Sequence, residues 1–203
     1  MKKFELTNEF VTNMFGTKLF RIRALVEFGD VEAGELGGYV EKESNLGHDD
    51  NAWVYDNAWV YGNARVYGDA WVYGNALVCG NARVYDNAWV YGDAQVSGDA
   101  LVCGDARVCG NGDYAYAHGF GSVNRTTTFF RLKDGGVGVR CGCFYGTLAQ
   151  FRDKIRETHG ESAIAEEYLD LAALMEKRFR RTGNEQKKKA ETDVYHTELN
   201  IVS

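Results

Sequence analysis

The chain has 203 residues, a formal net charge of −6, 24 glycines and no proline. This length suits one domain, or one domain with a small appendage. The acidic balance argues against a dedicated nucleic-acid-binding protein, which usually carries a basic patch. No apolar run approaches the roughly 18 residues that a membrane-spanning helix needs, and no signal-peptide pattern follows Met1. We therefore expect a cytoplasmic protein that makes no membrane contact.

The first 37 residues are expected to form an N-terminal β cap. Two strand-like segments, KKFELT and GTKLFRIRALVEF, are separated by a turn at Asn13 to Gly16. A β-helix needs a cover over its end, because an open strand edge would pair with other chains. We predict that these segments form a hairpin over the first coil.

Ten six-residue repeats follow one another without a gap from Asn51 to Gly110. Each repeat reads Asn or Asp, Ala, a variable residue, Val, mostly Tyr or Cys, and then Gly or Asp. Because alternate side chains of a strand take opposite faces, the Ala and Val should point inward and the variable residue outward. Gly, Asn and Asp tolerate positive φ, so the junction between repeats is expected to be a corner.

Three consecutive repeats, one for each side, make one coil, and this pattern resembles the hexapeptide-repeat left-handed β-helix. The predicted fold is mainly β: a single-stranded, triangular parallel β-helix over 38–122. The hand follows from the resemblance, since spacing alone does not fix it. Weaker repeats at 38–46 precede the regular ones, with two extra residues bulging out near 47–50. Residues 111–122 look like two degenerate closing repeats.

Residues that lie three repeats apart should stack on the same side of the coil. The first side then carries an outward column of Trp53, Trp71, Trp89 and Arg107, beside Tyr55, Tyr73 and Tyr91. Trp59 lies on the second side, and Arg65 and Arg83 lie on the third. An outward column of three Trp and three Tyr exceeds the usual apolar patch of a soluble monomer. We expect this side to be covered by a second subunit, by the C-terminal helices or by a partner protein.

The C-terminal part, 123–182, is expected to hold a β-hairpin and two α-helices. The hairpin is predicted around Asp134-Gly135-Gly136. Thr147 and Gln150 read as a capping box that opens a helix ending at Gly160. A second helix should begin near Ser162 and bury an apolar stripe. The stripe is formed by Ile164, Tyr168, Leu171 and Met175. Residues 183–203 read as a basic, mobile tail, with Lys187 to Lys189 in it.

The segments FGDVEAGELGGYVEKESNL and NAWVYDNA resemble a bacterial and prophage family of hexapeptide-repeat proteins that includes the YdcK-type proteins, often labelled transferases. CGCFYGTLAQF is similar to a C-terminal segment of the prophage members. The resemblance implies a bacterial host cell and an accessory protein acting on a host process. Because fold does not fix function, the transferase label is not carried over with it.

We predict a non-catalytic interaction protein of prophage type that binds a host protein, and could thereby inhibit it, through its flat aromatic faces. An active site normally breaks local regularity, and these repeats stay regular from Asn51 to Gly110. Aromatic and Arg side chains are enriched at interface hot spots. The predicted interface residues are Trp53, Trp71, Trp89, Tyr55, Tyr73, Tyr91, Trp59, Arg65, Arg83 and Arg107. A homo-oligomer, trimer or dimer, is the other partner considered, and nucleic acid is not an expected partner.

The alternative is a hexapeptide-repeat acyltransferase using acyl-CoA, the one cofactor considered. Such enzymes use a histidine as general base, and the repeats contain none. His48, in the bulge, and His118, after the last repeat, are the candidates. No metal site is expected, because the five cysteines form no CxxC pair and Cys141 and Cys143 are too close for a routine bridge.

Overall fold

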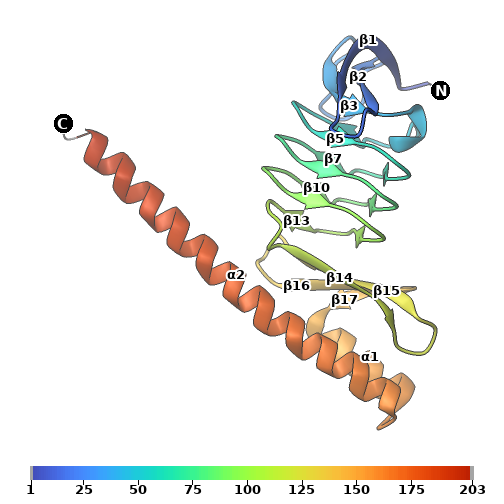
Figure 1. Ribbon diagram of the computed structural model, residues 1–203, viewed down its shortest axis with the longest axis vertical. Helices are drawn as coiled ribbons and strands as arrows, with labels where there is room; N and C mark the ends of the chain where they lie inside the picture. The colour runs from blue at the N-terminus through green and yellow to red at the C-terminus, as the bar shows by residue number, and fades with distance from the viewer. Residues whose placement is uncertain (1, 202–203) are drawn as a thin grey trace.

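The computed structural model describes the backbone of residues 2–201 and the side chains of residues 2–183. Its elements, in chain order, are a cap, a stack of short parallel strands, an antiparallel sheet and two helices (Figure 1). The mainly β fold, with a parallel β-solenoid and two C-terminal helices, is as the repeats and flanking segments predict. The left hand of the coil and its triangular cross-section stay predictions.

The cap is a hairpin followed by a third strand. β1 (Phe4–Thr12) and β2 (Lys18–Ala24) pair antiparallel, and β2 pairs with β3 (Leu36–Val40). In the turn, the Asn13 side chain accepts hydrogen bonds from the backbone N–H groups of Phe15 and Thr17. β3 is also the first parallel strand of the solenoid. The predicted hairpin cap is therefore joined to the solenoid by a continuous sheet.

Each regular repeat contributes a two-residue strand, and the strands fall into three parallel stacks. β4, β7, β10 and β13 form the first side, β3, β5, β8 and β11 the second, and β6, β9 and β12 the third. The bounds are β4 Trp53–Val54, β5 Trp59–Val60, β6 Arg65–Val66, β7 Trp71–Val72, β8 Leu77–Val78, β9 Arg83–Val84, β10 Trp89–Val90, β11 Gln95–Val96, β12 Leu101–Val102 and β13 Arg107–Val108.

The register between coils confirms both the period of three repeats and the predicted bulge. Val54 pairs with Val72, its equivalent three repeats later. Val40 pairs with Val60, and Leu46 bridges to Val66. Each of these two pairs is separated by two more positions along the chain than Val54 and Val72 are. The additional positions lie between the 3₁₀ turn η1 (Glu43–Asn45) and β4. The weak repeats at 38–46 are thus part of the solenoid.

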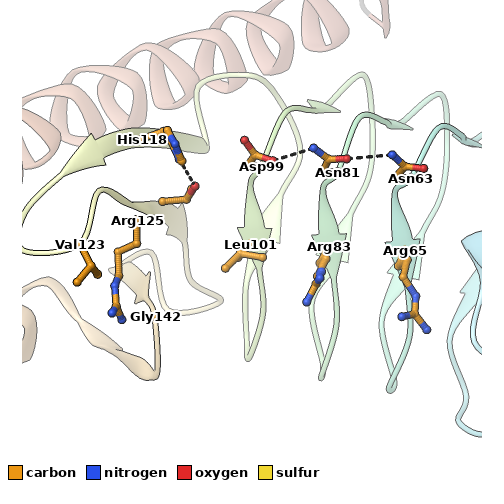
Figure 2. Close-up of a pocket in the computed structure, with 11 residues that line it drawn as sticks. Asn63, Arg65, Asn81, Arg83, Asp99, Leu101, His118, Val123, Arg125 and Gly142 are labelled. Carbon is orange, nitrogen blue, oxygen red and sulfur yellow. Dashed lines mark hydrogen bonds between the residues drawn. The ribbon is translucent and has the colours of Figure 1, made fainter.

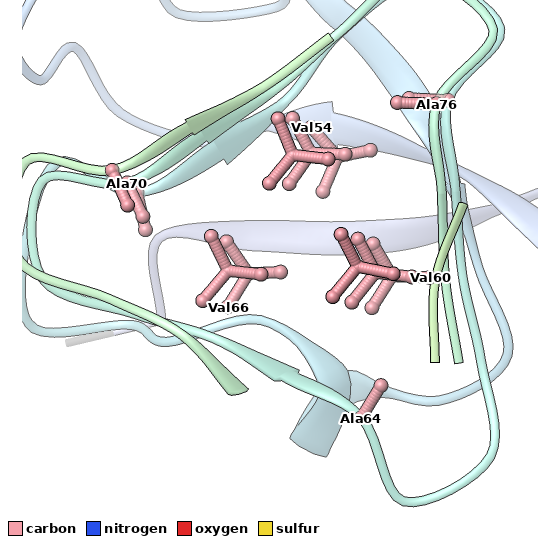
Figure 3. Close-up of a cluster of buried hydrophobic side chains, with 14 of the residues drawn as sticks. Val54, Val60, Ala64, Val66, Ala70 and Ala76 are labelled. Carbon is pink, nitrogen blue, oxygen red and sulfur yellow. The ribbon is translucent and has the colours of Figure 1, made fainter. Parts of the chain in front are cut away.

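The core of the solenoid is a column of Val and Ala side chains. Every repeat Val and Ala from Ala52 to Val108 is fully buried. Figure 3 shows Val54, Val60 and Val66 pointing inward from the three sides, each in line with its equivalents in neighbouring coils. A fully buried valine contributes about 1.5–3 kcal/mol relative to an exposed one. Repetition of this term along the stack supplies the driving force that such short strands lack individually.

Each corner consists of the last residue of one repeat and the first residue of the next, and only the last residue adopts positive φ. The last residue of each repeat up to Gly104 has it, as at Gly80 (φ 71°) and at the non-glycine residues Asp56 (φ 53°) and Asp86 (φ 57°). The Asp56 carboxylate accepts a hydrogen bond from the N–H of Gly74, one coil later. At several corners the first residue, Asn or Asp, instead forms a side-chain hydrogen bond to its equivalent in the next coil. Such bonds join Asn51 to Asp69, Asn63 to Asn81, Asn75 to Asp93, and Asn81 to Asp99.

Residues 111–122 do not close the solenoid as degenerate repeats. Tyr114 and Phe120 occupy the positions of the repeat Val, and both are too large for the interior. Residues Tyr114–Phe120 form β14, which pairs antiparallel with β15 (Arg125–Arg131). The buried Asp113 carboxylate accepts hydrogen bonds from the N–H groups of Cys109 and Gly110, where the chain leaves the last coil.

The expected C-terminal hairpin is part of a four-stranded antiparallel sheet. β15 pairs with β16 (Val137–Cys141) through the turn at Asp134-Gly135-Gly136, and β16 pairs with β17 (Phe144–Thr147). Phe130, fully buried, packs into the end of the solenoid core. Phe4 of the cap is also fully buried in that core. Both ends of the stack are therefore covered by the chain itself.

Two helices follow β17. α1 (Leu148–His159) begins at the predicted capping box of Thr147 and Gln150 and ends before Gly160. α2 runs Ala163–Ile201, beyond the expected end of the second helix. Its predicted stripe is buried at Tyr168, Leu171 and Met175, but Ile164 is exposed because it lies in the first turn. The basic residues expected in the tail, at 187–189, lie outside the side chains that are described.

Candidate functional site

The first column of outward residues is in register as predicted. Trp53, Trp71, Trp89 and Arg107 are paired neighbours across β4, β7, β10 and β13. The repeat thus places one residue of each coil directly over the next. Their environments nevertheless differ, because the two ends of the column meet different parts of the chain.

Trp53 is not on the surface: its side chain is fully buried. Phe4 and Phe28 of the cap meet the indole edge-on, with ring centroids 6.2 and 5.3 Å away. Gly37 leaves room for it, since a Cβ at that position would lie 2.8 Å from the indole ring. The predicted exposed column is therefore shorter than expected. Part of it is covered by the N-terminal cap, which was not among the covers expected from the sequence.

The remaining rings form a partly buried surface that we call the aromatic face, composed of Tyr55, Trp71, Tyr73, Trp89 and Tyr91. Trp71 and Trp89 are stacked, with centroids 5.2 Å apart and planes at 4°. Tyr73 and Tyr91 are stacked likewise, at 5.0 Å and 7°. Stacking between coils buries part of each ring, so it stabilises the solenoid as well as forming a surface. The described side chains of α2 pack on α1 and the C-terminal sheet and leave this face uncovered.

A pocket of about 440 Å³ opens on the aromatic face. Its walls combine Tyr55, Trp71, Tyr73 and Trp89 with two carboxylates, Asp30 of the cap and the corner residue Asp56. Burial raises the pKa of Tyr55 to about 12, and the nearby charges of Glu35, Asp30 and Asp56 act in the same direction. Aromatic faces beside carboxylates provide a favourable environment for a cation.

Arg107 demonstrates such a contact within the chain. Its guanidinium carbon lies 4.0 Å from the centroid of the Trp89 ring. Its terminal nitrogen also donates hydrogen bonds to the carbonyl oxygens of Asn87 and Ala106, at 2.9 and 2.8 Å. The C-terminal end of the Trp column is thus closed by a cation that belongs to the chain.

The other predicted interface residues are separated from the aromatic face. Trp59 is half-buried on the side that includes β5, paired with Tyr39 of the cap. Arg65 and Arg83 pair with each other on the side that includes β6 and β9, and both are exposed. The ten predicted residues therefore do not form one surface.

His48 is held by the cap. Its Nδ1 accepts a hydrogen bond of 3.2 Å from the backbone N–H of Lys3, and its ring stacks on Phe4 with centroids 4.4 Å apart. Burial is the main cause that lowers the pKa of this histidine. Because the hydrogen bond uses the Nδ1 lone pair, the arrangement is that of a structural residue.

His118 lies on β14 and is exposed. Its Nδ1 is 2.9 Å from the hydroxyl oxygen of Thr126 on β15. Figure 2 shows His118 at the edge of a groove that also contains Asp99 and Leu101, and Thr126 lines the same groove. A general base is usually oriented by a carboxylate, whereas the partner here is a hydroxyl.

Two thiols of the solenoid, the buried Cys103 and the partly buried Cys109, are poorly suited to nucleophilic chemistry. Burial raises the pKa of Cys103 and of Cys109 to about 11 in each case. The thiolate is the reactive form, so these cysteines remain protonated near neutral pH. Among residues 2–183, no three His, Cys, Asp or Glu side chains are arranged to hold a metal ion. Nor is any described helix both long and apolar enough to cross a membrane.

Sequence reasoning did not identify Asp30 and Asp56 as members of a pocket. Asp56 carries a signal that could have been used, because it replaces the glycine usual at the corner position. Asp30 gives no such signal, since only the folding of the cap brings it beside Trp71.

A comparison with known families matches the repeats. The YdcK Beta solenoid repeat family model matches residues 58–74, 76–92 and 94–110, three consecutive stretches of the regular repeats. No curated protein matches the chain. The match covers regular repeats from residue 58 to residue 110, and it includes neither the weak repeats at 38–46 nor the cap, the C-terminal sheet and the helices.

Proposed function

From the premise that this chain is built of YdcK-type β-solenoid repeats, we propose that it is a non-catalytic interaction protein. The partner is a protein, bound at the aromatic face through an arginine or lysine side chain. The observation that carries the proposal is the pocket in which Trp71 and Trp89 lie beside Asp30 and Asp56. The prophage type and the inhibition of a host protein remain part of the proposal and rest on the resemblance alone.

The aromatic rings and the two carboxylates of the pocket favour a positively charged side chain of the partner. A guanidinium or ammonium group over an aromatic ring gains about 0.5–2 kcal/mol, depending on how far it is desolvated. Trp89 is already enclosed between Trp71 and Arg107, so Tyr55 and Tyr73 are the rings of the pocket that the partner's cation would contact. Two carboxylates at the rim add charge attraction, which steers the encounter and falls with ionic strength. An uncharged apolar partner would provide no positive charge to balance the carboxylates of Asp30 and Asp56. The contact of Arg107 with Trp89 is the same interaction made within the chain.

The regularity of the solenoid supports a binding role over catalysis. The Val and Ala core is uninterrupted through ten repeats, with no loop extruded from them. The acyltransferase alternative is favoured by one observation, the position of His118 at the edge of a groove. Its test is turnover: an acyltransferase should transfer the acyl group of an acyl-CoA to an amine or hydroxyl acceptor and release free CoA, and His118→Ala should abolish that release.

The partner is sought by capture from host lysate with three forms of the protein. The wild type should retain a partner that Trp71→Ser/Trp89→Ser loses, with affinity reduced about 30-fold or more if the pair is a hot spot. Trp59→Ser is the matched control, because Trp59 holds the same repeat position on another side. Sedimentation of each form decides whether the retained partner is a second copy of the chain.

A synthetic arginine-containing peptide tests the chemistry separately. Tryptophan fluorescence should respond to the peptide in the wild type, and Asp30→Asn should weaken the response. Equal retention of the partner by Trp71→Ser/Trp89→Ser and wild type would refute the proposed face. Loss of retention with Trp59→Ser alone would assign the binding to another side.

A further inference from the structure

A second concave surface lies between the solenoid and the C-terminal sheet, away from the aromatic face. It is a groove of about 700 Å³. Arg65 and Arg83 project from adjacent coils, and Arg125 comes from the start of β15 (Figure 2). We call it the arginine groove. Leu101 and Val123 supply its apolar lining, and Gly142 leaves space that the Arg125 guanidinium occupies.

The three guanidinium groups have no acidic partner among the side chains that the structure describes. Arg65 contacts the Tyr67 ring, with 5.8 Å from its guanidinium carbon to the centroid, and makes no ion pair with a described residue. Arg65 and Arg83 are direct neighbours in a parallel ladder, where like charges destabilise the pairing. All three side chains are exposed, so their donors remain available for a ligand.

The polar side chains beside the arginines leave a net positive charge. Asn63 donates to Asn81, which donates to Asp99, so this ladder is satisfied by its own hydrogen bonds (Figure 2). Asp99 is the acidic side chain that lines the groove. Three arginines and one aspartate give +3 − 1 = +2, on a chain whose overall charge is −6. The groove is therefore a local reversal of the protein's charge.

We propose that the arginine groove binds a ligand through a dianionic phosphoryl group. A phosphate monoester carries a charge of about −1.5 to −2 near neutral pH, which matches the charge of the groove. The fork of a guanidinium matches the geometry of phosphate oxygens and forms strong, charge-assisted hydrogen bonds. Leu101 and Val123 contact the apolar part of the ligand. Bound phosphate would also relieve the repulsion between Arg65 and Arg83.

Phenyl phosphate is a suitable probe, because it joins a phosphoryl dianion to an apolar ring. Binding is measured by calorimetry with the full chain at constant ionic strength, against malonate and benzoate. Phenyl phosphate should bind more tightly than either. Arg83→Gln should weaken binding roughly tenfold or more, as expected for the loss of a charged hydrogen-bond donor. Arg83→Lys keeps the positive charge without the guanidinium fork, so its affinity for phenyl phosphate should lie between that of the wild type and that of Arg83→Gln.

Asp99→Asn provides a variant that gains affinity. Asparagine holds the same position at Asn63 and Asn81 and can still accept the hydrogen bond from Asn81, so the ladder is preserved. Removing this negative charge should tighten binding severalfold. Arg156→Gln on α1 removes an exposed arginine outside the groove, so it should leave the affinity for phenyl phosphate unchanged. Equal binding of malonate and phenyl phosphate, an unaltered affinity in Arg83→Gln, or the same loss in Arg156→Gln would overturn the proposal.

Discussion

The backbone conformation at the solenoid corners predicts that substitution of Gly80 lowers the stability of the protein. Gly80 has a φ of 71°, and a Cβ there would lie 2.9 Å from the backbone nitrogen of Gly98 in the next coil. A left-handed conformation costs an L-residue about 1–2 kcal/mol. Crowding against a backbone fixed by strand pairing adds about 1–3 kcal/mol. Gly80→Ala should therefore lower the free energy of unfolding by about 2–5 kcal/mol.

Two other glycines separate these contributions. Gly16, in the cap hairpin, has a φ of 81° but no atom within 4 Å of an added Cβ. Gly16→Ala should cost the conformational part alone, about 1–2 kcal/mol. Gly110 has open space and no positive φ. Gly110→Ala should be neutral, or stabilising by about 0.4–1 kcal/mol through the unfolded state.

Urea denaturation followed by circular dichroism measures all three variants, with the midpoint and slope compared to those of the wild type. The expected order of stability is Gly110→Ala, then Gly16→Ala, then Gly80→Ala. If Gly80→Ala cost no more than Gly16→Ala, the close approach between coils would not constrain the corner. If Gly110→Ala were as damaging as Gly80→Ala, the argument from φ and contact distance would be wrong.

Three further predictions concern the N-terminal cap and helix α1. Trp53→Ala, which empties a fully buried site under the cap, should cost about 3–5 kcal/mol in urea denaturation, and Trp59→Ala, at a half-buried site, should cost less. The pKa of His48 is lowered in the folded state, so as the pH falls the unfolded chain takes up a proton at this histidine at a higher pH than the folded chain does. The free energy of unfolding should therefore decrease as the pH drops below about 6.5. Thermal unfolding between pH 5 and 8 should show a weaker dependence in His48→Gln, and an unchanged dependence would contradict this assignment. Thr147→Ala removes the side-chain cap of α1 and should lower the free energy of unfolding by about 1 kcal/mol. A loss of stability seen only in the β-sheet signal, with the helical circular-dichroism signal unchanged, would contradict that role.

The candidate site was only partly accessible to sequence reasoning. The period of three repeats places Trp71 over Trp89 and Arg65 over Arg83, and the pairing confirms both. The period treats Trp53 as equivalent to Trp71, yet Trp53 is buried because the cap folds over the first coil. A repeat describes neighbours within the stack and carries no information about what meets its ends.

Local signals in the sequence were sufficient for the solenoid, the bulge, the cap hairpin and the capping box of α1. Each depends on residues close in the chain or at a fixed period, such as the Val and Ala of every repeat. The tertiary structure alone decided the burial of Trp53, the antiparallel path of β14 and the two concave surfaces. These features join segments with no shared period: Asp30 with Trp71, and Arg83 with Arg125. The pockets that these residues line together depend on how the cap and the C-terminal sheet pack against the ends of the stack.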